Sequence, residues 1–470
     1  MKKVFIIILT FFLMLLTSCS LDDIIDIILE DDPVIIHDDK QVNILSINDT
    51  HGASISDEST TGLDKVQSVI ETLEEQNGKY IKIANGDIYQ GGYLSNATNG
   101  LIMVDMLNKM NFDCFVIGNH EFDWGLDKIA LYKDGDLSNG ELNCKYICCN
   151  IVYKATNERP SWIDEYEIVE NHGYKVGIIG AIGASLESSI SSELVQDYNF
   201  INPDERIKEL SKELRNKHSC DLVILSIHEY NQTHNEEIAS FPYESRIDGI
   251  ICGHSHQKIN EYEKTNYNYQ IPVVQNYNMN GSISTIVYTL DEEINITNTL
   301  IKHYEPSNYP INQIINNIKN DYESLSYAGE EVIFTAKSYL SKEDLGIMIA
   351  KSMEEVSQSD IAFLNVGGTR TSVSKGKVRM KDILEIFPFD NNIYVFEMSG
   401  YLLDKLIKEN KDYLYLSKEI NIDTNKKYKV ATIDFIFNKK SYNYYFKNSN
   451  AENLPVTARE NFISYLKTLN

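Results

Sequence analysis

Short apolar runs alternate with stretches of helical periodicity between about residues 41 and 300. Two amphipathic stretches, 64–76 and 205–217, predict helices that lie between apolar runs. The apolar runs predict six buried strands, at 42–47, 80–84, 114–119, 175–181, 222–227 and 247–252. This alternation is typical of a layered α/β domain.

The alternation resumes in a second block, residues 331–470, which contains no cysteine. A polar, helix-like stretch at 309–327, opened by Pro310, lies between the two blocks. We therefore expect a first domain at 41–302, a helical connector at 303–330 and a second domain at 331–470.

The N-terminus has the pattern of a targeting segment. The basic "MKK" precedes an apolar run at 4–16, which is too short to cross a bilayer core of about 30 Å as a helix. The run ends in "LTSC", which resembles a bacterial lipobox in which Cys19 is lipidated, so 1–19 is predicted to be a lipoprotein signal peptide. An ordinary signal peptide with a chance cysteine is the alternative. Residues 20–40 are acidic and repetitive and are predicted to form a tether, which implies an extracytoplasmic protein anchored to the bacterial cell membrane.

Charge and cysteine content narrow the classes of partner. The chain has 43 Lys and Arg against 69 Asp and Glu, a net charge of −26, which disfavours binding to nucleic-acid polymers. A small phosphorylated substrate is compatible with this charge, because metal ions can reverse the local field.

No Cys-x-x-Cys pair exists, which argues against a structural zinc site, and Cys148 and Cys149 lie in an apolar run that predicts core packing. The pattern leaves open whether disulfides form among Cys114, Cys144, Cys148, Cys149, Cys220 and Cys252.

Polar side chains follow five of the predicted strands at the point where each strand ends. In an open α/β sheet, ligands bind beyond the carboxyl ends of the strands, so these side chains are expected to converge. In chain order they are Asp49 and His51, Asp87, Asn119 with His120 and Asp123, His228, and His254 with His256.

Imidazole and carboxylate groups without a thiolate suit Zn²⁺, Mn²⁺ or a similar divalent ion. A carboxylate can bridge two ions, and two ions about 4 Å apart can hold a hydroxide in line with a phosphorus atom. The sequence therefore predicts two divalent metal ions, Zn²⁺ or Mn²⁺. Each motif alone could be a hydrogen-bonded turn, but all of them together, each after a strand, argue against that reading.

The motifs "LSINDTHG", "NGDIYQGG", "GNHEFDWG" and "ICGHSHQ" resemble those of the 5′-nucleotidase family of calcineurin-like metallophosphoesterases. The resemblance covers about 41–470 and implies a four-layer α/β/β/α sandwich followed by an α+β substrate-binding domain. It implies that Asp49, His51 and His256 hold one metal, that Asn119, His228 and His254 hold the other, and that Asp87 bridges them. It also implies that His120 stabilises the phosphoryl transition state and that Asp123 orients His120. Glu121 is left unassigned, with a supporting or capping role on one side and a catalytic role on the other.

The second block resembles the substrate domain of the same family through "LNVGGTRTSVSKGKVRMKDILEIFPFDNNIYVFEMSG", residues 364–400. By this resemblance the substrate-binding residues are Asn365, Gly367, Gly368, Arg370, Phe389 and Phe435. Phe389 could instead be a core residue, and Phe437 competes with Phe435 for the role of second stacking ring.

This block departs from the family at three places, one of which is a shorter region between "GYLLDKLIKEN" and "YKVATIDF". The upstream arginine is missing, with only Lys337 and Lys342 nearby, and "FIFNKKSYNYY" (435–445) replaces the family's glycines and carboxylate with Lys439, Lys440 and Ser441. These departures put nucleoside selectivity in doubt.

The sequence thus predicts a surface-anchored dimetal phosphohydrolase that uses a metal-activated hydroxide to hydrolyse nucleoside 5′-monophosphates to nucleoside and phosphate. Its partners would be a nucleotide or another small phosphate ester, and the membrane through a lipid anchor only. Enzymatic alternatives are a 2′,3′-cyclic-nucleotide phosphodiesterase, a UDP-sugar hydrolase or a broader phosphomonoesterase. The non-enzymatic alternative is a surface adhesin lipoprotein on the same fold, which has no need of seven coordinating residues.

Overall fold

The computed structural model describes residues 41–56, 60–277, 282–289, 294–299, 309–321, 328–447 and 449–469. The predicted signal peptide, Cys19 and the acidic tether lie outside these ranges.

The first sheet has seven strands, and β1, β2 and β3 are consecutive neighbours in it. Strands β1, β2, β3, β4 and β6 run parallel, while β14 and β15 are antiparallel and extend the edge beside β1. In spatial order the strands are β15 (Ile294–Thr299), β14 (Ile283–Thr289), β1 (Gln41–Ile47), β2 (Ile81–Asn85), β3 (Cys114–Val116), β4 (Lys145–Ile147) and β6 (Ile163–Asp164).

The second sheet has six strands, and its parallel centre carries the remaining predicted strand ends. Strands β8, β10, β11 and β13 are parallel, with β7 and β12 antiparallel at the two edges. In spatial order the strands are β12 (Ile259–Lys264), β13 (Gln270–Gln275), β11 (Gly249–Ile251), β10 (Leu222–His228), β8 (Tyr174–Ile182) and β7 (Tyr166–Asn171).

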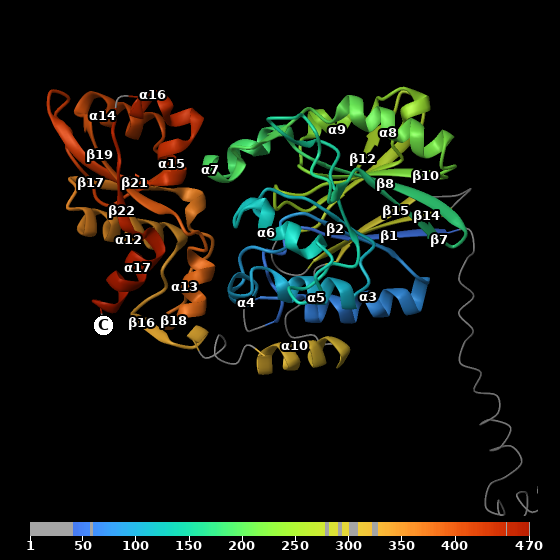
Figure 1. The fold of residues 1–470 in the computed structure, drawn as a ribbon, viewed down its shortest axis with the longest axis horizontal. Coiled ribbons are helices and arrows are strands. Elements are labelled where there is room, and N and C mark those ends of the chain that lie inside the picture. The colour runs from blue at the N-terminus through green and yellow to red at the C-terminus, as the bar shows by residue number, and fades with distance from the viewer. Residues whose placement is uncertain are drawn as a thin grey trace, which may run out of the picture. The chain divides into compact units, whose positions relative to one another are not determined.

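The two sheets pack face to face, with helices on both outer sides. Ile44 and Ile83 of the first sheet share one buried cluster with Ile178 and Ile224 of the second. Helices α3 (Leu63–Asn77) and α5 (Leu101–Lys109) pack on the first sheet, and α8 (Asp204–Asn216) and α9 (Gln232–Ala239) on the second (Figure 1). The predicted four-layer α/β/β/α sandwich is confirmed, since each sheet buries one face against its partner and the other against helices.

All six strands predicted from the apolar runs are present in this sandwich. The largest difference is at β3, which ends at Val116 rather than at residue 119. Smaller elements complete this part of the chain: α4 (Tyr93–Ala97), α6 (Leu126–Ala130), α7 (Ser192–Val195), β5 (Ile151–Tyr153) and β9 (Tyr198–Phe200).

The second block has its own sheet and its own buried core, as expected for an α+β arrangement. A pair of strands, β16 (Val332–Ala336) and β18 (Gly376–Arg379), accompanies the main sheet, and α10 (Tyr309–Asp321) lies in the predicted connector. The main sheet contains β20 (Leu414–Leu416), β17 (Ile361–Asn365), β21 (Lys427–Ile433), β19 (Asn392–Ser399) and β22 (Glu452–Thr457). Its helices are α12 (Lys342–Ser357), α13 (Met380–Ile386), α14 (Gly400–Glu409), α15 (Asp434–Asn438), α16 (Asn443–Phe446) and α17 (Ala458–Lys467).

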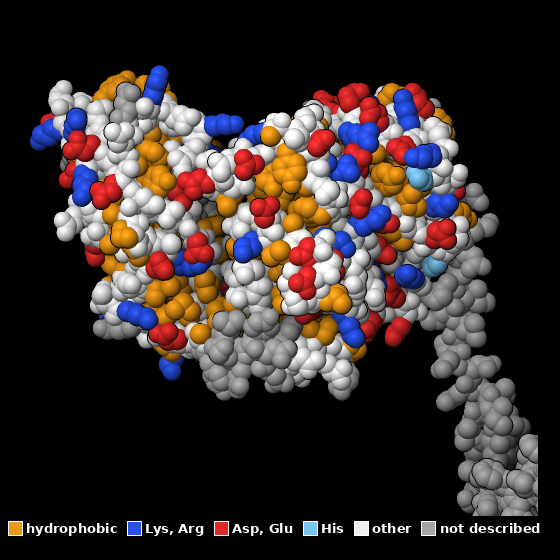
Figure 2. All heavy atoms as spheres, viewed as in Figure 1, with side chains coloured by type: hydrophobic (Ala, Val, Ile, Leu, Met, Phe, Trp, Pro, Cys, Tyr) orange, Lys and Arg blue, Asp and Glu red, His pale blue; other side chains and the backbone are white. Residues whose placement is uncertain are grey.

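The burial of the cysteines and the distribution of surface charge agree with what the sequence predicts. The six cysteines between 114 and 252 are buried free thiols, and Cys148 and Cys149 pack in the core as predicted. Acidic and basic side chains are interspersed on the face drawn in Figure 2, which has no continuous basic stripe of the kind that tracks a phosphate backbone. Among the described helices none combines the length and the apolar character needed to cross a bilayer.

Candidate metal centre

The predicted metal ligands come from loops that begin where parallel strands of both sheets end. Asp49 and His51 follow β1, Asp87 follows β2, and Asn119 follows β3. His228 is the last residue of β10, and the loop after β11 carries His254 and His256. Because the sheets pack face to face, these loops meet at one edge of the sandwich.

The ligand atoms lie close enough to hold cations. Asp49, His51 and His256 form one group and Asp87, His228 and His254 another, and in each group one ligand atom per residue lies within 4.8 Å of the others. Within these groups His51 Nε2 is 3.1 Å from His256 Nε2, and Asp87 Oδ2 is 3.1 Å from His228 Nε2. The two groups contain six of the seven predicted ligands.

The seventh predicted ligand, Asn119, also fits a metal site. Its Oδ1 atom is buried and has no hydrogen-bond partner among the described residues. The buried Asp87 Oδ2 and His228 Nε2 likewise make no well-formed hydrogen bond within the described part of the chain. Buried polar atoms without partners are uncommon in folded proteins, so Asn119 Oδ1, together with Asp87 Oδ2 and His228 Nε2, which lie 3.1 Å apart, has the chemistry of a ligand of a divalent cation.

Backbone contacts orient two of the imidazoles. His228 Nδ1 lies 2.8 Å from the carbonyl oxygen of Asn85, and His51 Nδ1 lies 3.3 Å from that of Gln90. When Nδ1 donates to a carbonyl, Nε2 keeps its lone pair and can bind a metal. The His228 ring also requires Gly86 beside it, because a Cβ atom at Gly86 would stand 2.4 Å from His228 Nδ1.

Five of the seven predicted ligands adopt left-handed backbone conformations, which residues other than glycine seldom do. The φ angles are 51° at Asp49, 46° at His51, 54° at Asp87, 70° at His254 and 56° at His256. Such conformations cost about 1–3 kcal/mol each and cluster at functional sites. Their concentration at this edge supports a functional rather than a merely structural role for the loops.

Burial and neighbouring charges shift the pKa values of two of the imidazoles strongly. Burial lowers the pKa of His228, but the Asp87 carboxylate outweighs burial and raises this pKa to about 10. Burial, assisted by the positive charge of His228, lowers the pKa of His254 to about 4. A proton on His228 offsets carboxylate charge here, and a bound divalent cation would do the same.

His120 and Asp123 form the predicted pair. His120 Nδ1 lies 2.7 Å from Asp123 Oδ2, and the carboxylates of Asp123 and Asp87 outweigh burial and raise the pKa of His120. His120 also belongs to a third possible metal group with His51 and Asp87. The geometry therefore allows His120 to act either on a substrate or as a ligand.

Two predicted residues of the second block lie near this cluster within the unit Lys40–Asn470. Arg370 Nη2 is 3.3 Å from His51 Nε2, and the ring of Phe389 stacks on the ring of His120 at 6.1 Å with an interplanar angle of 25°. Asn365 ends β17, and Gly367, Gly368 and Arg370 follow it closely in the chain. Asn365 Oδ1 is buried without a hydrogen-bond partner among the described residues.

The choice between Phe435 and Phe437 follows from their packing. Phe437 packs with Tyr394, Phe396 and Phe446, at centroid distances of 4.9 to 5.4 Å, and is part of an aromatic cluster. The half-buried Phe435 instead has Lys439 Nζ 5.0 Å from the centre of its ring. Phe435 is therefore the better candidate for contact with a substrate, although the ammonium group occupies one side of its ring.

The sequence left the role of Glu121 unassigned, and the surroundings of its side chain are unusual. The side chain is buried directly after His120. Burial and the neighbouring Asp87 carboxylate raise the pKa of Glu121 to about 7, while hydrogen bonds from backbone N–H groups act in the opposite direction.

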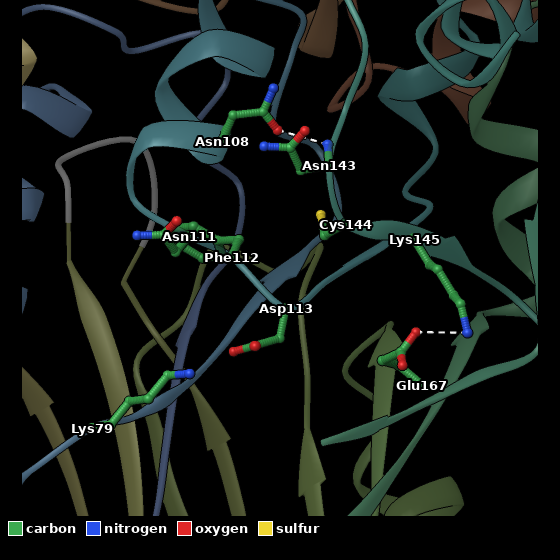
Figure 3. Close-up of a pocket in the computed structure, with 9 residues that line it drawn as sticks. All are labelled: Lys79, Asn108, Asn111, Phe112, Asp113, Asn143, Cys144, Lys145 and Glu167. Carbon is green, nitrogen blue, oxygen red and sulfur yellow. Dashed lines mark hydrogen bonds and ion pairs between the residues drawn. The ribbon is translucent and has the colours of Figure 1, made fainter. Parts of the chain in front are cut away.

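A separate pocket of about 350 Å³ lies at the other end of the strands (Figure 3). Its lining includes Asp113 and Lys145, which stand at the starts of β3 and β4. Lys145 Nζ already pairs with Glu167 Oε2 at 2.8 Å. None of the predicted site residues lines this pocket, so it is not part of the candidate metal centre.

Comparison with known proteins agrees with this arrangement. Residues 42–258 match the family model of calcineurin-like phosphoesterases, and residues 327–418 match that of the 5′-nucleotidase C-terminal domain. A 5′-nucleotidase precursor from Thermus thermophilus has a similar fold, with a TM-score of 0.80 at 19% identity over 91% of this chain and 96% of that one.

The relatives that are similar in sequence include an endonuclease and a 5′-nucleotidase. Endonuclease YhcR of Bacillus subtilis is 25% identical over 405 residues, which cover 78% of this chain but only 32% of that protein. A 5′-nucleotidase of Vibrio cholerae is 23% identical over 420 residues, which cover 77% of this chain and 74% of the relative. The chain thus spans about a third of the first relative and about three quarters of the second.

Proposed function

Because the chain belongs to the 5′-nucleotidase family of calcineurin-like phosphoesterases, we propose that it is a divalent-metal-dependent phosphoester hydrolase. Its preferred substrates are nucleoside 5′-monophosphates, which it hydrolyses to nucleoside and phosphate. Residues 41–302 form the catalytic domain and residues 331–470 the substrate-binding domain.

The convergence of the predicted ligands carries this proposal. Carboxylates and imidazoles from five segments at or just after strand ends, the segment of His120 included, bring their ligand atoms within 4.8 Å of one another in overlapping groups. An adhesin on the same fold has no use for such an arrangement. Two divalent ions held by Asp49, His51, Asp87, Asn119, His228, His254 and His256 would activate a water and offset the charge of the phosphoryl group.

His120 and Asp123 act on the phosphoryl group in this proposal. The 2.7 Å contact fixes the proton of Nδ1 towards Asp123, so the other ring nitrogen, Nε2, is free to face a substrate oxygen. The raised pKa of His120 favours a second proton on Nε2, which makes the ring a hydrogen-bond donor to negative charge that develops during transfer.

Arg370, Asn365 and Phe389 bind the substrate. A guanidinium beside His51 suits a phosphate because its fork makes two parallel hydrogen bonds. Gly367 and Gly368 leave room for a ligand next to the backbone. Phe389 and Phe435 offer rings on which a base can stack.

A substrate panel tests the activity. Purified protein with Mn²⁺ or Zn²⁺ is assayed against AMP, 2′,3′-cAMP, UDP-glucose and an aryl phosphate, before and after removal of metal by a chelator. We expect AMP to have the highest kcat/KM and all activity to disappear on chelation and return with metal. Equal kcat/KM for AMP and the aryl phosphate would reject the nucleotidase assignment and favour a broader phosphomonoesterase.

The broader activity has a specific observation in its favour. Lys439 lies over Phe435 at the place where the 5′-nucleotidase family has glycines and a carboxylate.

Absence of both metal uptake and turnover in the same assay would instead favour the adhesin.

The proposed location is the outer face of the bacterial cell membrane, with Cys19 as the lipidation site. The N-terminal pattern of basic, apolar and lipobox-like segments supports this proposal. A Cys19→Ser variant expressed in a bacterial host should move from the membrane fraction to the soluble fraction. If its distribution matches that of the unmodified protein, Cys19 is not an anchor.

A further inference from the structure

Glu121 is a buried carboxylate whose hydrogen-bond partners, within the described part of the chain, are all backbone groups of the site loops. The residue is only 1% exposed. Oε2 accepts hydrogen bonds from the N–H groups of Gly118 at 2.8 Å and of Asp87 at 2.9 Å. Oε1 accepts from the N–H groups of Ile88 at 2.9 Å and of Tyr89 at 3.4 Å.

Asp87 in turn accepts a hydrogen bond from the loop that carries Glu121. Its Oδ1 accepts a hydrogen bond from the N–H of His120 at 2.8 Å. The loop after β2 and the loop after β3 are therefore tied in both directions, each by a carboxylate of the other. The tie leaves Asp87 Oδ2 facing His228 Nε2.

The tie also supports a strained backbone. Asp87 has a φ angle of 54°, and Gly86 before it has a φ angle of 78°. Consecutive backbone N–H groups can point towards one side in such a turn, where a single acceptor binds them. The carboxyl group of Glu121 is that acceptor for the N–H groups of Asp87, Ile88 and Tyr89.

We infer that Glu121 is a positioning residue that holds Asp87 in the orientation needed to bind metal. This inference rests on the proposed metal-dependent function. Glu121 itself does not touch the metal ions, since its oxygens are occupied by backbone donors. Removing one of its two acceptor oxygens would allow the Asp87 turn to relax and would weaken the metal site without removing a ligand.

The isosteric variant Glu121→Gln tests this role. In either orientation of the amide, its NH₂ group faces two backbone N–H groups and leaves them without an acceptor. The matched control is Ser95→Ala, because buried Ser95 donates its hydroxyl to the carbonyl of Tyr89 in the same loop and not to Asp87.

The readouts are the Mn²⁺ dissociation constant by calorimetry and the melting temperature without and with Mn²⁺. We expect Glu121→Gln to raise the dissociation constant about tenfold to hundredfold, as is usual when a group supporting a ligand is lost. The increase in melting temperature on adding Mn²⁺ should shrink accordingly, whereas Ser95→Ala should lower the metal-free melting temperature and leave the dissociation constant unchanged.

Two results would overturn the inference. One is an unchanged Mn²⁺ dissociation constant in Glu121→Gln, which would make Glu121 a purely structural residue. The other is equal weakening in both variants, which would assign the effect to general loosening of the loop. If Glu121→Gln does not fold, Glu121→Asp is judged by the same criteria. Failure of the unmodified protein to bind Mn²⁺ would reject the proposed function itself, which separates the two conclusions.

Discussion

Replacement of His120 by alanine distinguishes the two roles that its position allows. The imidazole is paired with Asp123 and also lies in a possible metal group with His51 and Asp87. The contact from residue 120 to Asp87 comes from the backbone N–H at 2.8 Å, so His120→Ala keeps it. The variant thus removes the ring without disturbing the support of Asp87.

The expected loss can be estimated from the role of a hydrogen-bond donor. Removing one donor that stabilises developing negative charge lowers kcat by about 10²–10³, or about 2.7–4 kcal/mol. Asp123→Asn should cause a smaller loss, because the ring stays but loses the carboxylate that orients it and raises its pKa. All seven predicted ligands remain in both variants.

The assay combines kcat for AMP with the metal content per protein molecule by elemental analysis. We expect His120→Ala to bind as much metal as the unmodified protein while losing most of its kcat. A metal content lower by one equivalent, or a weakened metal dissociation constant, would make His120 a ligand and refute the reasoning.

Three further predictions concern substrate binding and stability. Arg370→Lys keeps the charge but loses the fork, so kcat/KM for AMP should fall about tenfold, the effect of losing one charge-assisted hydrogen bond; an unchanged value would exclude a bidentate contact. Phe389→Leu should raise KM for AMP by about fivefold to hundredfold, the range that corresponds to a base-stacking energy of about 1–3 kcal/mol, but not KM for glycerol phosphate, which has no ring; equal changes would make Phe389 a core residue. His234 contacts Glu229 at 2.7 Å and Asp204 at 2.8 Å, and these hydrogen bonds raise its pKa from 6.5 to about 9. Its contribution to stability should be complete below about pH 6.5 and lost as the pH rises through about 9, so the melting temperature of His234→Gln should fall less over this range than that of the unmodified protein.

The sequence predicts the centre of the sandwich well, because buried parallel strands are continuous apolar runs with few other interpretations. The positions of the candidate ligands follow for a related reason. A polar residue at or immediately after the end of such a run has to lie at the carboxyl edge of its sheet, so His228 at the end of β10 and Asp87 after β2 are located before any packing is known.

The edges of the sheets are much harder to predict. Strand β12 carries the sequence "INEYEK", which is mostly exposed and has no apolar run. Strand β14 pairs with β1 across more than two hundred residues, and no local pattern specifies such a partner. Antiparallel edge strands with one solvated face depend on tertiary pairing more than on their own composition.

The role of Glu121 was also beyond sequence reasoning, for a different reason. Its partners are backbone N–H groups, and most belong to residues more than thirty positions earlier in the chain. Backbone groups carry no sequence signature, so only the structure brings them together with the carboxylate. The choice of Phe435 over Phe437 has the same origin, since both rings follow one strand and only packing separates them.

The left-handed conformations of the predicted ligands bear on how the metal site is organised. At about 1–3 kcal/mol each, five such residues are a substantial cost that other contacts must offset. Those contacts are present in the protein itself: the N–H groups of Asp49 and His51 donate to the carbonyls of Gly86 and Asp87, each at 3.0 Å, and the N–H of His254 donates to the Asp49 carboxylate. Glu121 completes this set through its hydrogen bond from the N–H of Asp87. The loops are therefore held in their strained form by one another, and if they carry the proposed metal site, a change at a supporting residue should lower metal affinity even though every ligand is retained.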